Sequence, residues 1–162
     1  ARYRRIDVKR PAVESEPDAM QAVRMRRAGL KSAMSGLEIA IAAPAPGRVC
    51  EWARGVRDAV VVVHEVWTRH VVETEAPGAF LDELVEAAPR LSKPALRLRE
   101  EHGEILSILL AVEDRLAVEM EDVEWAESLR SDLTTLLVAL ARHRQRGADL
   151  VYEAYDVDIG GG

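Results

Sequence analysis

The apolar residues of this chain repeat with the spacing of packed helices, and this repeat limits the fold more than any other feature. Within residues 91–116 they alternate steps of four and three: Leu91, Ala95, Leu98, Ile105, Leu109, Val112 and Leu116. Between Leu98 and Ile105 the same spacing calls for one more apolar residue, and the chain has His102 at that position. A repeat of about 3.5 residues keeps one stripe of a helix facing its neighbours. His102 is therefore predicted to point into the core.

The same spacing occurs in two further stretches, and each includes one histidine. The upstream stripe consists of Val56, Val60, Val63, Trp67, His70 and Thr74. The downstream stripe consists of Leu129, Leu133, Leu136, Leu140, His143, Gly147 and Leu150. Three predicted helices thus each place a histidine on the core side. The fourth histidine, His64, lies beside its stripe and is expected to be partly exposed.

Length and composition narrow the class of protein. The chain has 162 residues, the size of one domain, and its 48% apolar and 4% aromatic content favours helix packing over a sheet. The net charge of -6 argues against a nucleic-acid surface over the whole domain. A single cysteine, Cys50, excludes an internal disulfide and a multi-cysteine metal site. There is no apolar run of about 20 residues and no secretory signal core, so we expect a cytoplasmic protein without a membrane partner.

The order of the predicted helices and their links along the chain predicts an all-α fold, an up-down-up-down four-helix bundle. Residues 1–17 are basic and then acidic, lack any period, and are expected to form an extended N-terminal arm. The bundle is assigned to 18–155, and the glycine-ending 156–162 is expected to be a flexible C-terminal tail. Caps and breakers place long helices at 18–43, 48–75, 94–118 and 125–155, with a short helical segment at 80–88.

Helix counting places the three inward histidines at one height. His70 lies shortly before the end of the second long helix, and His102 lies a similar distance after the start of the third. A matching count into the fourth helix reaches His143, within about one turn. Buried imidazoles need partners, and one metal ion would satisfy all three. The alternative is a plain polar layer in the core.

Carboxylates near the histidines are candidates to complete such a site. Glu73, one turn beyond His70, is the best placed and is predicted as a fourth metal ligand. Glu75 lies further round that helix. Glu101 and Glu104 flank His102 away from its stripe, where each is expected either to face solvent or to accept an imidazole N–H rather than to bind metal.

Several segments together resemble sequences of the hemerythrin-like, or HHE cation-binding, family. The resemblance is strongest to divergent bacterial members. The segments are HVVETEAPGAFLDEL (70–84), APRL (88–91), LREEH (98–102) and ARHRQRGADLVYEAYDVDIGG (141–161). The resemblance covers about residues 18–160. It implies a bundle that holds non-haem iron, with a di-iron centre in the family, and that binds oxygen or senses oxygen, redox state or iron.

Carried over to this chain, the resemblance matches His70, His102 and His143 to the ligand histidines of the second, third and fourth helices. The first predicted helix has no histidine. Three further positions where the family places ligands are occupied by Thr74, Leu106 and Gly147. These departures favour one metal ion, or none, over a complete di-iron set.

Three functions remain open on these grounds. The first is a hemerythrin-like binder of iron, mono- or dinuclear, or of another divalent metal, with oxygen as a candidate small ligand. The second is a metal-free degenerate bundle that serves as a protein-interaction or dimerisation module, in which case a homodimer is expected. The third, a ferritin-like oxidase, is disfavoured because no Glu-x-x-His pair is present. The chain also lacks a phosphate loop and a nucleophile elbow, so we do not expect an enzyme.

Overall fold

The computed structural model describes residues 16–118 and 122–156, and over these residues the chain is helical without any strand. This confirms the prediction of an all-α fold. None of the helices in these ranges combines the length and the apolar character needed to cross a bilayer. The elements are α1 (Glu16–Ala42), α2 (Val49–Glu75), α3 (Phe80–Ala87), the 3-10 turn η1 (Pro89–Leu91), α4 (Ser92–Leu116) and α5 (Val123–Asp156).

The observed boundaries follow the predicted ones within a few residues. Helix α1 begins at Glu16 rather than Asp18, so the last part of the predicted arm belongs to the helix. The rest of the arm, 1–15, and the tail beyond residue 156 lie outside the described residues. Helix α4 begins at Ser92, which leaves Pro94 in the first turn, where its missing N–H breaks no helical hydrogen bond.

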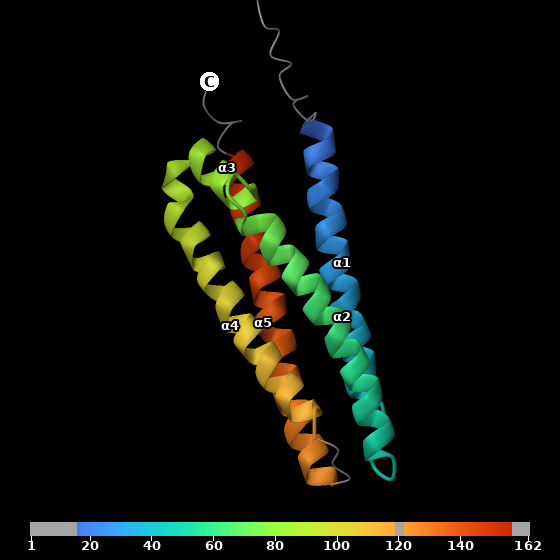
Figure 1. The fold of residues 1–162 in the computed structure, drawn as a ribbon. Coiled ribbons are helices and arrows are strands. Elements are labelled where there is room, and N and C mark those ends of the chain that lie inside the picture. The colour runs from blue at the N-terminus through green and yellow to red at the C-terminus, as the bar shows by residue number, and fades with distance from the viewer. Residues whose placement is uncertain (1–15, 119–121, 157–162) are drawn as a thin grey trace, which may run out of the picture.

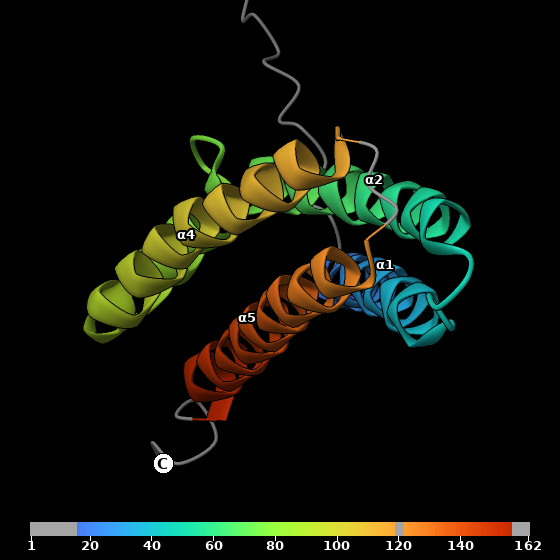
Figure 2. The same ribbon diagram turned by 90° about the horizontal axis from the view of Figure 1, so that it is seen from below.

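The four long helices pack in two pairs. Helices α1 and α2 lie side by side and are joined by a short loop, and α4 and α5 form the second pair (Figure 1). Viewed along the helices, α2 and α4 form one layer while α1 and α5 form the other (Figure 2). Helix α3 and η1 lie where α2 leads into α4, at the end opposite the loop between α1 and α2 (Figure 1).

The buried residues form two apolar clusters, one on each side of the histidines. The larger cluster joins the four long helices and includes Trp67, Ile105 and Leu140, which are at most 3% exposed. The smaller cluster gathers around α3 and includes Leu98 and Leu150. Because the α4 and α5 stripes pass from one cluster to the other through their histidines, the imidazole layer lies between the two clusters. That position isolates the layer from water except where a cavity reaches it.

Candidate metal centre

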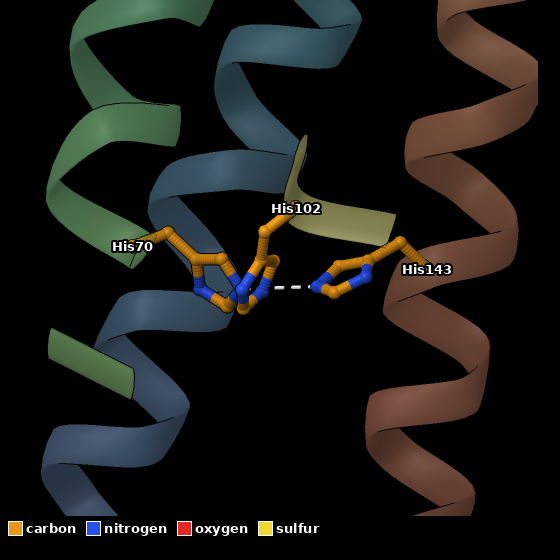
Figure 3. A group of neighbouring side chains, drawn as sticks. All are labelled: His70, His102 and His143. Atoms are coloured by element: carbon orange, nitrogen blue, oxygen red, sulfur yellow. Dashed lines mark hydrogen bonds between the residues drawn. The ribbon is translucent and has the colours of Figure 1, made fainter. Parts of the chain in front are cut away.

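Three imidazoles from three helices converge in this layer. His70 of α2, His102 of α4 and His143 of α5 point toward one another (Figure 3). Each offers a ring nitrogen, and these nitrogens all lie within 4.8 Å of one another. His102 and His143 are 4% and 3% exposed, and His70 is half-buried. The structure therefore brings together all three histidines that the sequence predicts to point inward.

Trp67 forms an apolar wall against this cluster. Its side chain is fully buried one turn before His70 on α2. The indole centroid lies 5.3 Å from the ring of His70, 5.4 Å from that of His102 and 5.0 Å from that of His143. Contact with all three rings restricts their rotation and excludes water on that side.

A carboxylate orients the imidazole of His102. Its Nδ1 lies 2.5 Å from Oε1 of Glu75, the last residue of α2. A carboxylate accepts hydrogen bonds, so the proton of the neutral ring resides on Nδ1 and donates to Glu75. The Nε2 atom then carries the lone pair that can bind a metal. A carboxylate behind a histidine in this way is the usual support of a metal ligand.

A second carboxylate supports His143 in the same way. Nδ1 of His143 lies 3.0 Å from Oε2 of Glu101, a buried residue of α4. Arg146 Nε lies 2.7 Å from the other oxygen, Oε1, as an ion pair without the alignment of a hydrogen bond. Burial raises the pKa of Glu101, and the positive charge of Arg146 opposes that rise. Arg146 therefore favours the carboxylate form of Glu101, which keeps the proton of His143 on Nδ1.

The third imidazole contacts the second directly. Nε2 of His70 lies 3.1 Å from Nε2 of His143. Because His143 has its proton on Nδ1, its Nε2 accepts and the Nε2–H of His70 donates. A metal that binds both Nε2 atoms must displace that proton, which leaves His70 protonated on Nδ1 instead. His70 is thus the ligand whose tautomer changes on metal binding.

The two most buried histidines favour the neutral form that binds metal. Burial lowers the pKa of His143 to about 3, and the neighbouring His102, His70 and Arg146 add to the effect. Burial also lowers the pKa of His102, although its hydrogen bond to Glu75 acts in the opposite direction. Both rings are therefore neutral at pH 7, so protons compete little with a metal ion for their Nε2 atoms.

The carboxylates near the histidines have different positions in the structure. Glu73 is not part of the group formed by the three histidines, and its assignment as a fourth ligand stays a prediction. Residue 73 lies at the edge of the α2 stripe and is half-buried, while Thr74 takes the buried position and donates its hydroxyl to the carbonyl of His70 at 2.8 Å. Glu101 does accept an imidazole N–H, but from His143 rather than from its sequence neighbour His102.

A cavity of about 270 Å³ reaches the imidazole layer. All three histidines line it, together with Thr74 of α2 and Arg144 of α5. Nothing in the stripe pattern predicts this cavity. Residue 147, where the family resemblance would place a carboxylate, is a glycine in its wall, so the chain has space where a further ligand side chain would stand.

The fourth histidine has a separate partner. Nδ1 of His64 lies 2.6 Å from Oε1 of Glu113, and both side chains are about one-third exposed or less. This agrees with the expectation that His64 is partly exposed. It places a histidine–carboxylate pair on α2 and α4 outside the candidate metal centre.

Comparison with known proteins gives no further assignment. No protein-family model matches this chain, and no curated protein or solved structure is significantly similar to it.

Proposed function

We propose that this chain is a hemerythrin-like, up-down-up-down four-helix bundle that binds one divalent metal ion, with non-haem iron the first candidate. The ligands are the Nε2 atoms of His70, His102 and His143. In this function the protein is a sensor or binder of a small molecule such as oxygen rather than an enzyme. The supporting observation is that carboxylates hold Nδ1 of two imidazoles and so direct their free Nε2 atoms into one space.

The donor set fits this proposal. Imidazole nitrogens suit iron, zinc, copper and nickel, and three protein ligands leave positions for a small molecule. The cavity beside the histidines provides the room. Among the described residues the group includes no carboxylate ligand. One ion is therefore favoured over a dinuclear centre, which needs bridging ligands as well.

A second candidate is a metal-free bundle that acts as an interaction or dimerisation module. The hydrogen bond between His70 and His143 favours it, because these imidazoles satisfy each other without a metal. The two candidates differ in what His102 contributes. If the layer binds no metal, a leucine at position 102 would match the apolar neighbours on its stripe, and no metal binding would be lost.

Metal content tests the proposal. The protein is purified without affinity-tag nickel, treated with chelator, reloaded with Fe²⁺ or Zn²⁺, desalted and analysed for bound metal. We expect near-stoichiometric metal in the parent chain and its loss in His102→Leu. His64→Leu is the matched control, because it removes a histidine that lies on α2 but outside the cluster.

The outcomes separate the two candidates. Metal in the parent and in His64→Leu, but not in His102→Leu, supports the three-histidine centre. A folded parent that takes up no metal, or equal metal in all three proteins, contradicts it. Circular dichroism of each variant checks that loss of metal does not reflect loss of the fold.

A further inference from the structure

The cavity beside the imidazoles has apolar walls. Leu30 of α1, Leu81 of α3 and Leu98 of α4 line it and are at most 5% exposed, and Phe80 and Val151 add half-buried apolar surface. Its volume of about 270 Å³ equals that of roughly nine water molecules at about 30 Å³ each. A compound with a similar number of non-hydrogen atoms therefore fits, which is more than a diatomic ligand requires.

Among the described residues, one permanent charge lines this space. Arg144 lines the cavity, and its Nε is buried without a hydrogen-bond partner among the described residues. No carboxylate of the described residues lines the cavity. A buried donor without a partner is unfavourable, and a guanidinium matches a carboxylate in charge and geometry. The cavity is therefore suited to an anion.

The remaining polar side chains of the wall already have partners. The hydroxyl of Thr74 donates to the carbonyl of His70 at 2.8 Å, and Nε2 of Gln145 donates to Oδ1 of Asp149 at 2.8 Å. Apart from the imidazoles, Arg144 is thus the only cationic donor to a ligand among the described wall residues. A phosphate or a sugar needs more polar partners than this, whereas a single carboxylate on a hydrocarbon chain does not.

We propose that the cavity binds a small monocarboxylate with a short hydrocarbon chain. Its carboxylate pairs with Arg144 beside the imidazole layer, and its chain packs against Phe80, Leu81 and Val151. The monocarboxylate would be the small molecule bound at the candidate metal centre, and that part of the proposal rests on the proposed function. The contacts with Arg144 and the apolar wall need no metal, so ligand binding and metal binding are separable.

Titration calorimetry with hexanoate tests the ligand class. Hexanoate is added to the full chain after chelator treatment and, separately, after metal loading. Hexanol supplies the same chain without the charge, and inorganic phosphate supplies a charge without the chain. We expect saturable binding of hexanoate, with hexanol and phosphate weaker by at least about tenfold, since a hydrogen-bonded charge contributes that much.

Two variants test the location. Arg144→Gln removes the charge and should weaken hexanoate binding at least about tenfold. Arg142→Gln is its matched control, because residue 142 is exposed on α5 and does not line the cavity. Ala148→Phe fills the cavity while keeping Arg144, and it should also weaken binding. If melting curves show that Arg144→Gln does not fold, Ala148→Phe decides the location.

The proposal is overturned if the folded parent does not bind hexanoate, or if hexanol or phosphate binds equally well. Unchanged binding by folded Arg144→Gln, or by Ala148→Phe, also overturns it. Metal uptake without hexanoate binding contradicts only the carboxylate site. Hexanoate binding by a chain that takes up no metal contradicts only the metal centre.

Discussion

The chemistry of each histidine depends on the group behind its Nδ1 atom. His102 and His143 donate this nitrogen's proton to Glu75 and Glu101, and both rings are buried. His64 also contacts a carboxylate, Glu113, but it has no second imidazole in its group. The same residue type is therefore a candidate ligand in one place and a partner in a surface pair in the other.

Removal of the charge behind His102 should weaken metal binding. We expect Glu75→Gln to lower the affinity for Zn²⁺ by about 10-fold to 100-fold, the usual effect of losing a group that supports a ligand histidine. The measurement is competition with a chromogenic chelator. Glu73→Gln on the same helix is the control and should change the affinity much less. A larger loss in Glu73→Gln would instead support Glu73 as a metal ligand.

Acid should destabilise the metal-free protein through His143. Its pKa is 6.5 in the unfolded chain and about 3 in the fold, so below 6.5 the unfolded chain binds a proton that the folded chain does not. Stability is therefore lost as the pH falls from 6.5 toward 3. Between pH 7 and pH 5 this histidine should account for about 2 kcal/mol.

Urea unfolding in chelator at these two pH values measures that loss. The His143→Leu variant should lose less stability on acidification than the parent, because the unfolded variant has one fewer site to protonate. His64→Leu serves as the control and should keep the contribution of His143. Equal losses in the parent and in His143→Leu would show that this imidazole does not resist protonation in the fold.

At the scale of elements, the connection between α2 and α3 places one wall of the cavity. Gly78 in this connection has a φ of +73°, and its N–H donates to Oδ2 of Asp82 at 3.0 Å. Oδ1 of the same carboxylate accepts from Arg99 of α4 at 2.5 Å. Asp82 therefore ties the turn and α3 to α4, which keeps Phe80 and Leu81 in the cavity wall.

Two glycine substitutions should act in opposite directions. Gly78→Ala should destabilise the fold by about 1–2 kcal/mol, because a Cβ disfavours a positive φ even where space is open. Gly55→Ala should stabilise it by about 0.5–1 kcal/mol, since residue 55 is helical and a Cβ there meets no atom within 4 Å. Urea denaturation of both variants measures the changes. A Gly78→Ala variant as stable as the parent would contradict the role assigned to this turn.

At the scale of the molecule, the candidate metal centre links three of the four long helices. Its histidines belong to α2, α4 and α5, while the described part of α1 contributes Leu30 to the cavity wall. The layer also lies between the two apolar clusters. A bound metal would therefore hold together the part of the bundle where the apolar packing is interrupted.

Metal should stabilise the whole fold by linkage. At a free metal concentration about a hundred times Kd, the free energy of unfolding should rise by about 2.7 kcal/mol. For a chain of 162 residues this corresponds to an increase in Tm of about 5–10 °C. Thermal unfolding of the parent and of His102→Leu, each with Zn²⁺ and with chelator, checks it. The same increase in both proteins would mean that the metal acts elsewhere.

The sequence alone was enough to predict the helices, their buried stripes and the three inward histidines. Each of these depends on the spacing of residues along one helix, so a period of three and four residues places Leu98, His102 and Ile105 on one face wherever that helix packs. The common height of the imidazoles was also predictable, because each histidine lies at a similar number of residues from the helix end that faces the next helix.

Only the tertiary structure decided which carboxylate meets which imidazole. Glu75 supports His102 and Glu101 supports His143, whereas the sequence favoured Glu73 as a ligand. The cavity, and the position of Arg144 in its wall, were likewise visible only in the tertiary structure. These contacts depend on how each helix is rotated and shifted against its neighbours. The apolar spacing shows which face of a helix turns inward, but the finer rotation and axial shift that pair one carboxylate with one imidazole are set by packing across the whole bundle.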